Sequence, residues 1–299
     1  MKKKSVMLLT VCICLGIVGC GNNVTTDGAA TAQKKTEAVT TEAASAEGTE
    51  AESEEETSSV QLDQGESAEY VTSIDMVDYS RDVKDDNGVI MLKVTQNCPD
   101  ITIDGSAAAA DNVNDFYLKE KEAFDATVEK YTQMAKDDYA GRSEEEKANF
   151  HAYELGLEYT LKRSDDQCIS IVKDSYEYTG GAHPNAFREA AVFDTATGEQ
   201  LTLDDIFEDV DKTKTFFVDY LTEELKDKKY ADTLFEDYEK DIPDILTDDN
   251  TWYLSKEGYV IICNEYIISP HSSGIMEFTI PYDKVDGFSD MYRPDGNAK

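Results

Sequence analysis

Hydrophobic and polar positions alternate most regularly in the middle of the chain. Over residues 153–161 every second residue is apolar, which is typical of a β-strand with one buried face. The polar run 164–166 predicts a tight turn, and the apolar-rich segment 168–178 is expected to return as the antiparallel neighbour. The remaining segments expected in this part are a strand at 187–193, a turn at 194–198 and a short run at 201–203.

Two other segments have helical spacing. Apolar residues from Val113 to Met134 recur at intervals of three, four and seven, which predicts an amphipathic helix. Residues 217–225 show the same spacing. Further strands are expected at 89–94 and 101–103, on either side of Pro99, and within 252–268. Because strands and helices do not alternate regularly, we predict an α+β fold, with antiparallel or mixed β-sheets packed against two main amphipathic helices.

The first twenty residues have the features of a targeting segment. Lys2, Lys3 and Lys4 precede an apolar run at 6–18, which is too short to span a bilayer as a stable helix. The closing residues 17–20 (Ile-Val-Gly-Cys) resemble the bacterial lipobox, which implies cleavage before Cys20 and lipidation of that cysteine. We therefore expect a lipid-anchored, extracytoplasmic protein at the cell surface. An ordinary secretory signal with an incidental cysteine is the alternative.

Residues 21–69 are rich in Ala, Thr, Ser, Glu and Gly and contain 12 acidic and two basic residues. Such a segment cannot bury enough apolar surface to offset its chain entropy, so we expect a disordered acidic spacer.

The net charge also limits which partners the protein can bind. The whole chain carries a net charge of −35, and residues 70–299 carry −28. This acidity excludes nucleic acid as a partner and disfavours anionic membranes unless a lipid holds the protein there.

A set of motifs occurs in order over the last two fifths of the chain. They are Tyr178-Thr179-Gly180-Gly181-Ala182-His183-Pro184-Asn185, Thr197-Gly198, Leu201 to Phe207, Asn264 to Pro270 and Ile280-Pro281-Tyr282. Together they resemble the extracellular domain family of the lysozyme-sensing anti-sigma factor RsiV, which also precedes the catalytic part of the peptidoglycan deacetylase PdaC. The resemblance covers roughly 176–285, and residues 70–175 resemble the companion region. It implies an extracytoplasmic recognition fold, with lysozyme as the ligand in one branch.

The chain departs from both relatives. No membrane-spanning helix of an anti-sigma factor and no metal motif of a polysaccharide deacetylase is found in the sequence. We therefore expect a binding lipoprotein without catalysis, which recognises a basic protein such as lysozyme or a cell-wall component. The alternative is a cell-wall (peptidoglycan) processing enzyme or an accessory of one. The predicted organisation is a signal peptide (1–19), lipidated Cys20 with the linker (20–69), an N-terminal region (70–175) and a C-terminal region (176–299).

Candidate binding residues come from two predicted loops. They are Tyr178, Gly180, Gly181, His183, Pro184, Asn185, Tyr266, Pro270 and His271. Two adjacent glycines permit unusual backbone angles, so we expect Gly181→Val to destabilise the domain by about 1–3 kcal/mol. His183, held in a fixed direction by the proline after it, can act as a general base, a metal ligand or a hydrogen-bonded turn residue.

No metal or cofactor is expected, because the three histidines (His151, His183 and His271) do not lie at ligand spacing on one element. Ser272 and Ser273 follow His271 but lack the sequence context of a nucleophile. The acidic turns at 85–88 and 248–250 lack the spacing of a calcium loop. Cys98, Cys168 and Cys263 are either all free thiols or one disulfide with one free thiol. Tyr266, Tyr282 and Tyr292 fall in predicted loops and are expected to offer recognition surface.

Overall fold

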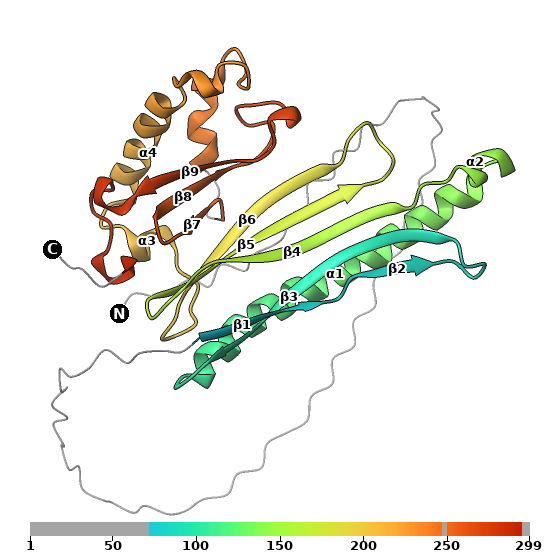
Figure 1. Ribbon diagram of the computed structural model, residues 1–299, viewed down its shortest axis with the longest axis horizontal. Helices are drawn as coiled ribbons and strands as arrows, with labels where there is room; N and C mark the ends of the chain where they lie inside the picture. The colour runs from blue at the N-terminus through green and yellow to red at the C-terminus, as the bar shows by residue number, and fades with distance from the viewer. Residues whose placement is uncertain (1–71, 247–249, 295–299) are drawn as a thin grey trace, which may run out of the picture. The chain divides into compact units, whose positions relative to one another are not determined.

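The computed structural model describes residues 72–246 and 250–294, which form two β-sheets with helices packed against them (Figure 1). The strands are β1 (Thr72–Asp78), β2 (Arg81–Lys84), β3 (Ile90–Ile103), β4 (Tyr153–Ser164), β5 (Cys168–Tyr178), β6 (Asn185–Asp194), β7 (Trp252–Leu254), β8 (Gly258–Cys263) and β9 (Met276–Pro281). The α-helices are α1 (Ala107–Gly141), α2 (Glu144–Ala148), α3 (Leu203–Ile206) and α4 (Val210–Glu224). Short 3-10 helices are η1 (Lys228–Tyr230), η2 (Tyr238–Leu246), η3 (His271–Ser273), η4 (Tyr282–Lys284) and η5 (Asp290–Tyr292). The predicted α+β class is confirmed.

The first sheet has the order β1-β3-β4-β5-β6, with the short strand β2 paired to the other half of β3. The predicted hairpin is present as β4 and β5, in which Tyr159 lies opposite Lys173. All pairs are antiparallel except β3 with β4, which are parallel. Helix α1 connects those two strands, as a parallel pair requires a crossover connection. The fold therefore includes one strand–helix–strand unit that the sequence pattern did not indicate.

Helix α1 is longer than the predicted apolar stripe. Its first turn contains the buried residues Ala109 and Ala110, whose small side chains allow the helix to approach the rest of the fold closely. Gly198 shows how tight this contact is. It has φ of 68°, and a Cβ atom there would overlap the carbonyl oxygen of Ala109. The Thr197-Gly198 turn is therefore required for docking the β6–α3 connection onto α1.

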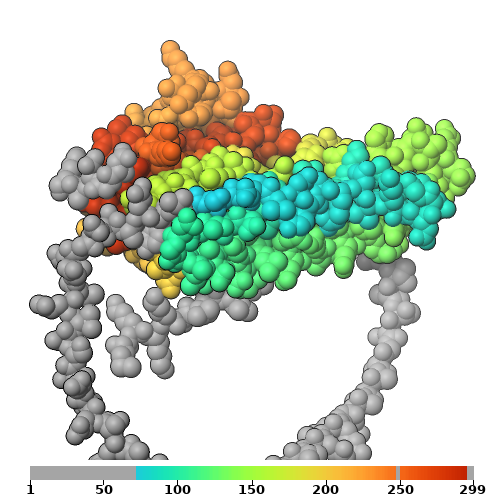
Figure 2. Space-filling model, turned by 60° about the horizontal axis from the view of Figure 1, so that its bottom comes forward, coloured from blue at the N-terminus to red at the C-terminus, as the bar shows by residue number. Residues whose placement is uncertain are grey.

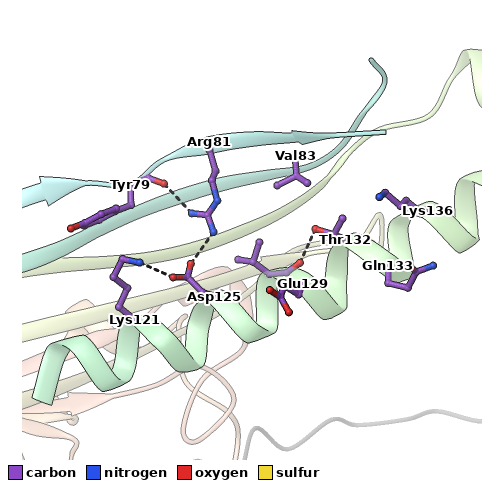
Figure 3. A pocket seen from close by; sticks show the side chains of 10 residues that line it. Tyr79, Arg81, Val83, Lys121, Asp125, Glu129, Thr132, Gln133 and Lys136 are labelled. Carbon is purple, nitrogen blue, oxygen red and sulfur yellow. Dashed lines mark hydrogen bonds and ion pairs between the residues drawn. The ribbon is translucent and has the colours of Figure 1, made fainter. Parts of the chain in front are cut away.

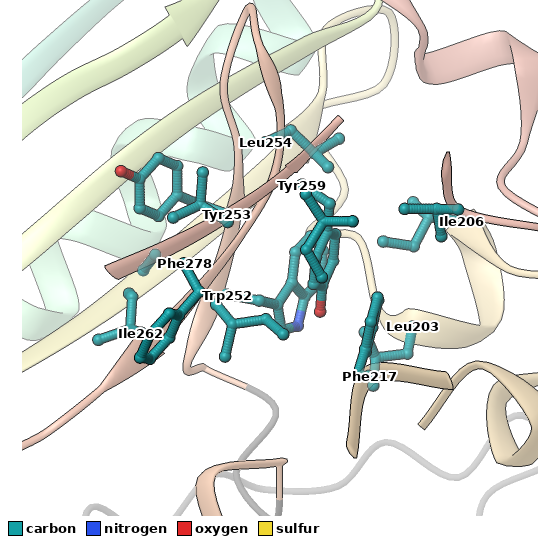
Figure 4. Packing of buried hydrophobic residues seen from close by; sticks show 14 of the residues in the cluster. Leu203, Ile206, Phe217, Trp252, Tyr253, Leu254, Tyr259, Ile262 and Phe278 are labelled. Atoms are coloured by element: carbon teal, nitrogen blue, oxygen red, sulfur yellow. The ribbon is translucent and has the colours of Figure 1, made fainter. Parts of the chain in front are cut away.

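The second sheet, β7-β8-β9, is antiparallel and packs with α4 against residues of β5 and β6. All six residues of β8 are buried. In the centre of this core the ring of Tyr259 stacks on Phe217, with 4.8 Å between centroids, and on Trp252, with 5.5 Å (Figure 4). This apolar core supports the loop between β8 and β9.

Two predicted elements differ from the structure. Residues 89–94 and 101–103 belong to one strand, β3, which continues through Pro99. The proline is tolerated because β4 pairs with β3 only as far as Gln96, so no neighbour on that side needs its amide proton. The run 201–203 is not a strand, and the isolated bridge to Phe193 is made by Gln200 just before it. Leu201 donates its N–H to Val192, after which the capping box of Thr202 begins α3.

Exposure of the tyrosines was predicted correctly for one of three. Tyr266 is 54% exposed, whereas Tyr282 and Tyr292 are 8% and 6% exposed. Both buried tyrosines contact Arg163, which is itself buried: its Nη1 donates to the Tyr282 hydroxyl and to the Tyr292 carbonyl. The short C-terminal helices thus close over the end of β4 instead of forming surface loops. The three described cysteines are buried free thiols.

The predictions for the signal segment, Cys20, the acidic linker and Asp248 and Asp249 concern positions outside the described residues. Among residues 72–246 and 250–294, no helix has both the length and the apolar character needed to cross a bilayer.

Candidate functional site

The two predicted binding loops lie together in the structure. One joins β5 to β6 and contains His183, and the other joins β8 to β9 and contains Tyr266 and His271. The His183 and His271 rings stack with centroids 4.2 Å apart and an angle of 20° between their planes. The ring of Tyr266 lies 6.3 Å from each of them. We call these three residues and Glu265 the histidine–tyrosine cluster.

The first loop is shaped by a glycine and a tyrosine. Gly180 has φ of 92°, a conformation that favours glycine. The hydroxyl of Tyr178 donates to the carbonyl oxygen of Gly181 at 3.1 Å, which closes the loop. Gly181 itself has no positive φ, and a Cβ there would meet only the His183 carbonyl at 3.8 Å. The expectation that Gly181 is the constrained glycine is therefore wrong, and Gly180 has that role.

The second loop is fixed to β6 by Asn264. Its buried side chain accepts a hydrogen bond from the Arg188 N–H at 2.7 Å and donates to the Arg188 carbonyl at 2.9 Å. Arg188 in turn forms ion pairs with Asp174 and Glu277. Asn264 thus pairs with the backbone N–H and carbonyl of Arg188 on β6 at the point where the loop begins.

Tyr266 has φ of 67° and is the one non-glycine residue with positive φ among the described residues. Its N–H donates to the Ser269 carbonyl at 2.9 Å, which closes the turn. A non-glycine residue in this region costs about 1–2 kcal/mol. Such strain persists where the surroundings enforce it, and it is frequent at functional sites. Here it places the most exposed aromatic side chain of the described structure on the cluster.

Hydrogen bonds define how the rings are held. The Pro184 carbonyl can only accept, so the Nδ1 of His183, at 2.9 Å, carries the proton of the neutral ring. The Nε2 atom then accepts from the Tyr266 hydroxyl at 3.2 Å. The Nδ1 of His271 lies 2.6 Å from the Glu265 carboxylate, whose side chain is only 8% exposed. Each imidazole is therefore oriented by a partner from its own loop.

The cluster offers aromatic rings beside a carboxylate with little exposure. No group of three histidine, cysteine or carboxylate side chains suited to a metal occurs in the described part of the chain. Ser273 donates its hydroxyl to the Thr233 carbonyl at 2.8 Å, so it is not aligned as a nucleophile for His271. What the site presents is an exposed ring face beside a buried carboxylate. Such a face binds planar cations and apolar ligand surfaces.

The structure brings together residues from both predicted loops, and Pro270 precedes η3 directly before His271. Asn185 is exposed at the start of β6, and His151 is exposed before β4. Sequence reasoning missed Glu265 and Asn264 as parts of the site, although both lie in a motif that it singled out. Their roles depend on contacts with distant parts of the chain, such as the Asn264–Arg188 pair, which spacing alone does not reveal.

Comparisons with known families match two regions of the chain. Residues 84–186 match the family model described as deacetylase PdaC, and residues 204–283 match that of DUF3298, a protein family of unknown function. The chain thus has one region similar to the deacetylase PdaC family and one region similar to DUF3298. His183 lies in the first region, and Tyr266 and His271 lie in the second. The histidine–tyrosine cluster therefore forms where the two matched regions meet.

Two solved structures are similar to this chain, and the first of them shares its fold. A DUF3298 family member from Bacteroides fragilis aligns with a TM-score of 0.54 and 19% identity, over 73% of this chain and 94% of that one. A DUF3298 family protein from Pseudomonas aeruginosa aligns with a TM-score of 0.47 and 14% identity, over the same shares. At this level of identity the first likeness concerns the fold alone. A comparison with curated proteins found no match.

Proposed function

We propose that this protein is an extracytoplasmic binding module of the cell envelope, anchored through a lipid on Cys20. It recognises a basic protein such as lysozyme, or a cell-wall component, through the histidine–tyrosine cluster. The match of its two regions to PdaC and DUF3298 supports a role connected with the cell wall. The RsiV-like motifs support lysozyme as the ligand, and the net charge of −28 over residues 70–299 has the complementary sign.

One observation carries this proposal: the exposed Tyr266 ring is held in a strained backbone conformation and is fixed by the His183 imidazole. A fixed aromatic ring loses little conformational entropy on binding, so it suits the centre of an interface. A guanidinium or ammonium group of a basic protein can lie on its face, where cation–π attraction contributes about 0.5–2 kcal/mol. The adjacent Glu265 carboxylate strengthens the preference for a cation.

Charge and shape contribute to different steps of this binding. The acidic surface attracts a basic partner over about 8–10 Å at physiological salt and raises the association rate. The ring contact is short-ranged and mainly slows dissociation. We therefore expect an association rate that falls steeply with salt and a dissociation rate that changes much less.

The test is a titration of the full-length protein with lysozyme and with cytochrome c, an unrelated basic protein, at about 0.15 M salt. The proposal predicts salt-resistant binding to lysozyme alone. Equal binding to both proteins that disappears with salt would leave acidity as the whole explanation, and the proposal would fail.

The second candidate function is that of a peptidoglycan-processing enzyme or accessory, favoured by the match to a deacetylase family model. Incubation of the protein with muropeptides distinguishes the two candidates. Unchanged muropeptides are expected for a binding module, and a modified product would establish the enzyme.

The anchor is tested separately, since Cys20→Ser should release the protein from membranes or block its processing.

A further inference from the structure

Strand β1 forms an open edge of the six-stranded sheet, because β3 is its only partner among the described strands. The space-filling view shows β1 and β2, in blue, on the surface beside α1 (Figure 2). The opposite edge strand, β6, is covered by other parts of the chain. The Ala190 N–H donates to the Asn250 carbonyl, and the Leu201 N–H donates to the Val192 carbonyl. The seven residues of β1 are therefore the long uncovered edge of this sheet.

The backbone groups that face this edge belong to Ile74 and Met76. Ile74 lies opposite Ile101 in the ladder. The side chain of Asn114 accepts from the Ile101 N–H at 2.9 Å and donates to the Ile101 carbonyl at 2.8 Å, so these groups do not face β1. Met76 lies opposite Pro99, which has no N–H. Both are therefore non-hydrogen-bonded pairs, and the N–H and carbonyl groups of Ile74 and Met76 point away from β3.

This edge is held in place before any partner binds. The half-buried side chains of β1 pack on the core beneath α1. Directly after the strand, the Tyr79 N–H donates to the Gln96 carbonyl at 2.7 Å. Arg81 donates to the Gln96 side-chain oxygen at 2.7 Å and, as Figure 3 shows, to the Asp125 carboxylate of α1 at 2.8 Å. A strand fixed in this way loses little conformational entropy when another strand pairs with it.

The exposed face of β1 selects the charge of a partner. Asp75 lies opposite Asp100 of β3, and both side chains are exposed. Like charges directly opposite each other destabilise a sheet, and neither carboxylate has an ion pair within residues 72–246 and 250–294. A lysine or arginine on a strand added beside β1 would offset this repulsion. The strand contains no proline, lysine or bulge, which are features that protect the edges of natural sheets.

Two other occupants fit this edge poorly. Two β1 strands paired in full antiparallel register would place the Asp75 carboxylates of both copies opposite each other, and each copy carries −28 over residues 70–299. The linker, residues 21–69, contains 12 acidic and two basic residues, so it offers few cations. A cationic segment in which basic and apolar residues alternate matches both faces of the strand. Its basic residues lie beside Asp75 and its apolar residues beside Ile74 and Met76.

We infer that β1 binds an extended segment of a cationic partner protein as an added strand of the sheet. Recognition by strand addition takes its affinity from backbone hydrogen bonds and its specificity from alternate side chains. The inference goes beyond the proposed function, because β1 and the histidine–tyrosine cluster share no residue. The cluster contacts a partner through a ring face, whereas β1 recognises an extended backbone.

The test is a fluorescence-anisotropy titration of a blocked seven-residue peptide of alternating lysine and valine with the full-length protein, at about 0.15 M salt. Two methylated forms of the peptide are the decisive probes. One carries methyl groups on the backbone nitrogens of its lysines, and the other on those of its valines. Both keep the charge and the side chains, but each lacks the N–H groups of one edge. We expect one form to bind like the parent peptide and the other at least about tenfold more weakly, because only one edge can pair with β1.

Substitutions in the protein test the same contact. Asp75→Lys should weaken binding of the peptide about three- to tenfold, as for a cross-strand charge pair that becomes repulsive. Met76→Pro removes an outward N–H without breaking a ladder bond to β3, and should weaken binding at least about tenfold. Thermal unfolding checks that this variant is folded, and Asp75→Lys provides the readout if it is not. Glu158→Lys is the matched control on the interior strand β4, where the side chain is also exposed, and it should leave the affinity unchanged.

Equal binding of the two methylated peptides, or equal affinities for wild type, Asp75→Lys and Glu158→Lys, would overturn the inference, because net charge alone would then explain the binding. Equally tight binding of the corresponding glutamate–valine peptide would also overturn it. Dimerisation that Met76→Pro abolishes would assign the edge to a second copy, and binding that appears only after removal of residues 21–69 would assign it to the linker. Tyr266→Asn should leave peptide binding unchanged, so failure of this inference and failure of the proposed function are distinguishable.

Discussion

The region beneath α1 and the C-terminal region are held together by different kinds of contact. Beneath α1, the Lys173 ammonium lies between two carboxylates, 2.8 Å from Glu120 and 2.7 Å from Glu189. The hydroxyl of Tyr159 also donates to Glu120, at 2.8 Å. In the C-terminal core the central contacts are between stacked aromatic rings. There, Phe217, Tyr259 and Trp252 fill the space between β8 and α4.

This difference explains where the histidine–tyrosine cluster lies. A densely packed apolar core resists deformation, so it can hold the β8–β9 loop with Tyr266 in a strained conformation. The layer beneath α1 instead contains paired charges. Substitutions in the C-terminal region should therefore change stability mainly by altering packing. Substitutions beneath α1 should change it mainly by altering charge.

The largest effect is expected from Gly258→Val at the start of β8. A Cβ atom there would overlap the carbonyl oxygen of Ile280 on the neighbouring strand, and backbone cannot move aside as a side chain can. We expect a loss of about 4 kcal/mol in the free energy of unfolding, measured by urea denaturation. Gly141→Ala is the control, because that position has open space and should be neutral or slightly stabilising. A mild effect at Gly258 would show that this core is less tightly fixed than described.

A smaller effect is expected from Lys173→Met, which leaves Glu120 and Glu189 facing each other. The three side chains are 16%, 17% and 23% exposed, so we expect a loss of about 2–3 kcal/mol, less than for a fully buried pair. Lys119→Met removes an exposed charge from α1 and should change stability by less than about 0.5 kcal/mol. Equal effects of the two substitutions would remove the distinction between the regions.

The pH dependence of the Lys173 effect has a defined sign. Burial opposes the ammonium form, but the two carboxylates outweigh burial and raise the pKa of Lys173. A raised pKa stabilises the folded state fully below the ordinary lysine value of about 10.4, and the contribution is lost as the pH rises through the folded value. The difference in melting temperature between wild type and Lys173→Met should stay constant from about pH 7 to 9 and shrink above about pH 10.5. A difference that stayed unchanged above about pH 11 would contradict this assignment.

The smallest effect concerns the two glycines of the β5–β6 loop. Gly180→Ala places a Cβ on a residue with φ of 92°, in otherwise open space, and should cost about 1 kcal/mol. Gly181→Ala should be close to neutral, because neither φ nor its neighbours oppose a side chain. Thermal unfolding of both variants measures the difference. A larger loss at Gly181 would show that the loop is shaped differently.

The sequence predicted elements well where one periodic pattern determines them. The alternation at 153–161 and the helical spacing from Val113 to Met134 both correspond to real elements, because one buried face selects each pattern. The parallel pairing of β3 with β4 could not be predicted, since it depends on which strands α1 connects. Burial of Tyr282 and Tyr292 could not be predicted from the sequence either, because it depends on Arg163 at the end of a distant strand.

The candidate site shows the same limit. The motifs identified His183, Tyr266 and His271, but the sequence did not indicate that their rings stack. It also did not distinguish Gly180 from Gly181, because φ depends on how the loop closes.

The most direct test of the binding account is Tyr266→Asn, with dissociation from lysozyme and thermal unfolding measured on the same protein. Asparagine tolerates positive φ, so the backbone strain is relieved while the ring is lost. We predict a melting temperature equal to or above that of wild type, together with dissociation from lysozyme at least about tenfold faster at 0.15 M salt, as for loss of an interface hot spot. Phe187→Ala, which removes another exposed aromatic ring (41% exposed), should leave dissociation unchanged. Unchanged lysozyme dissociation for Tyr266→Asn would contradict the assignment of the histidine–tyrosine cluster as the binding site.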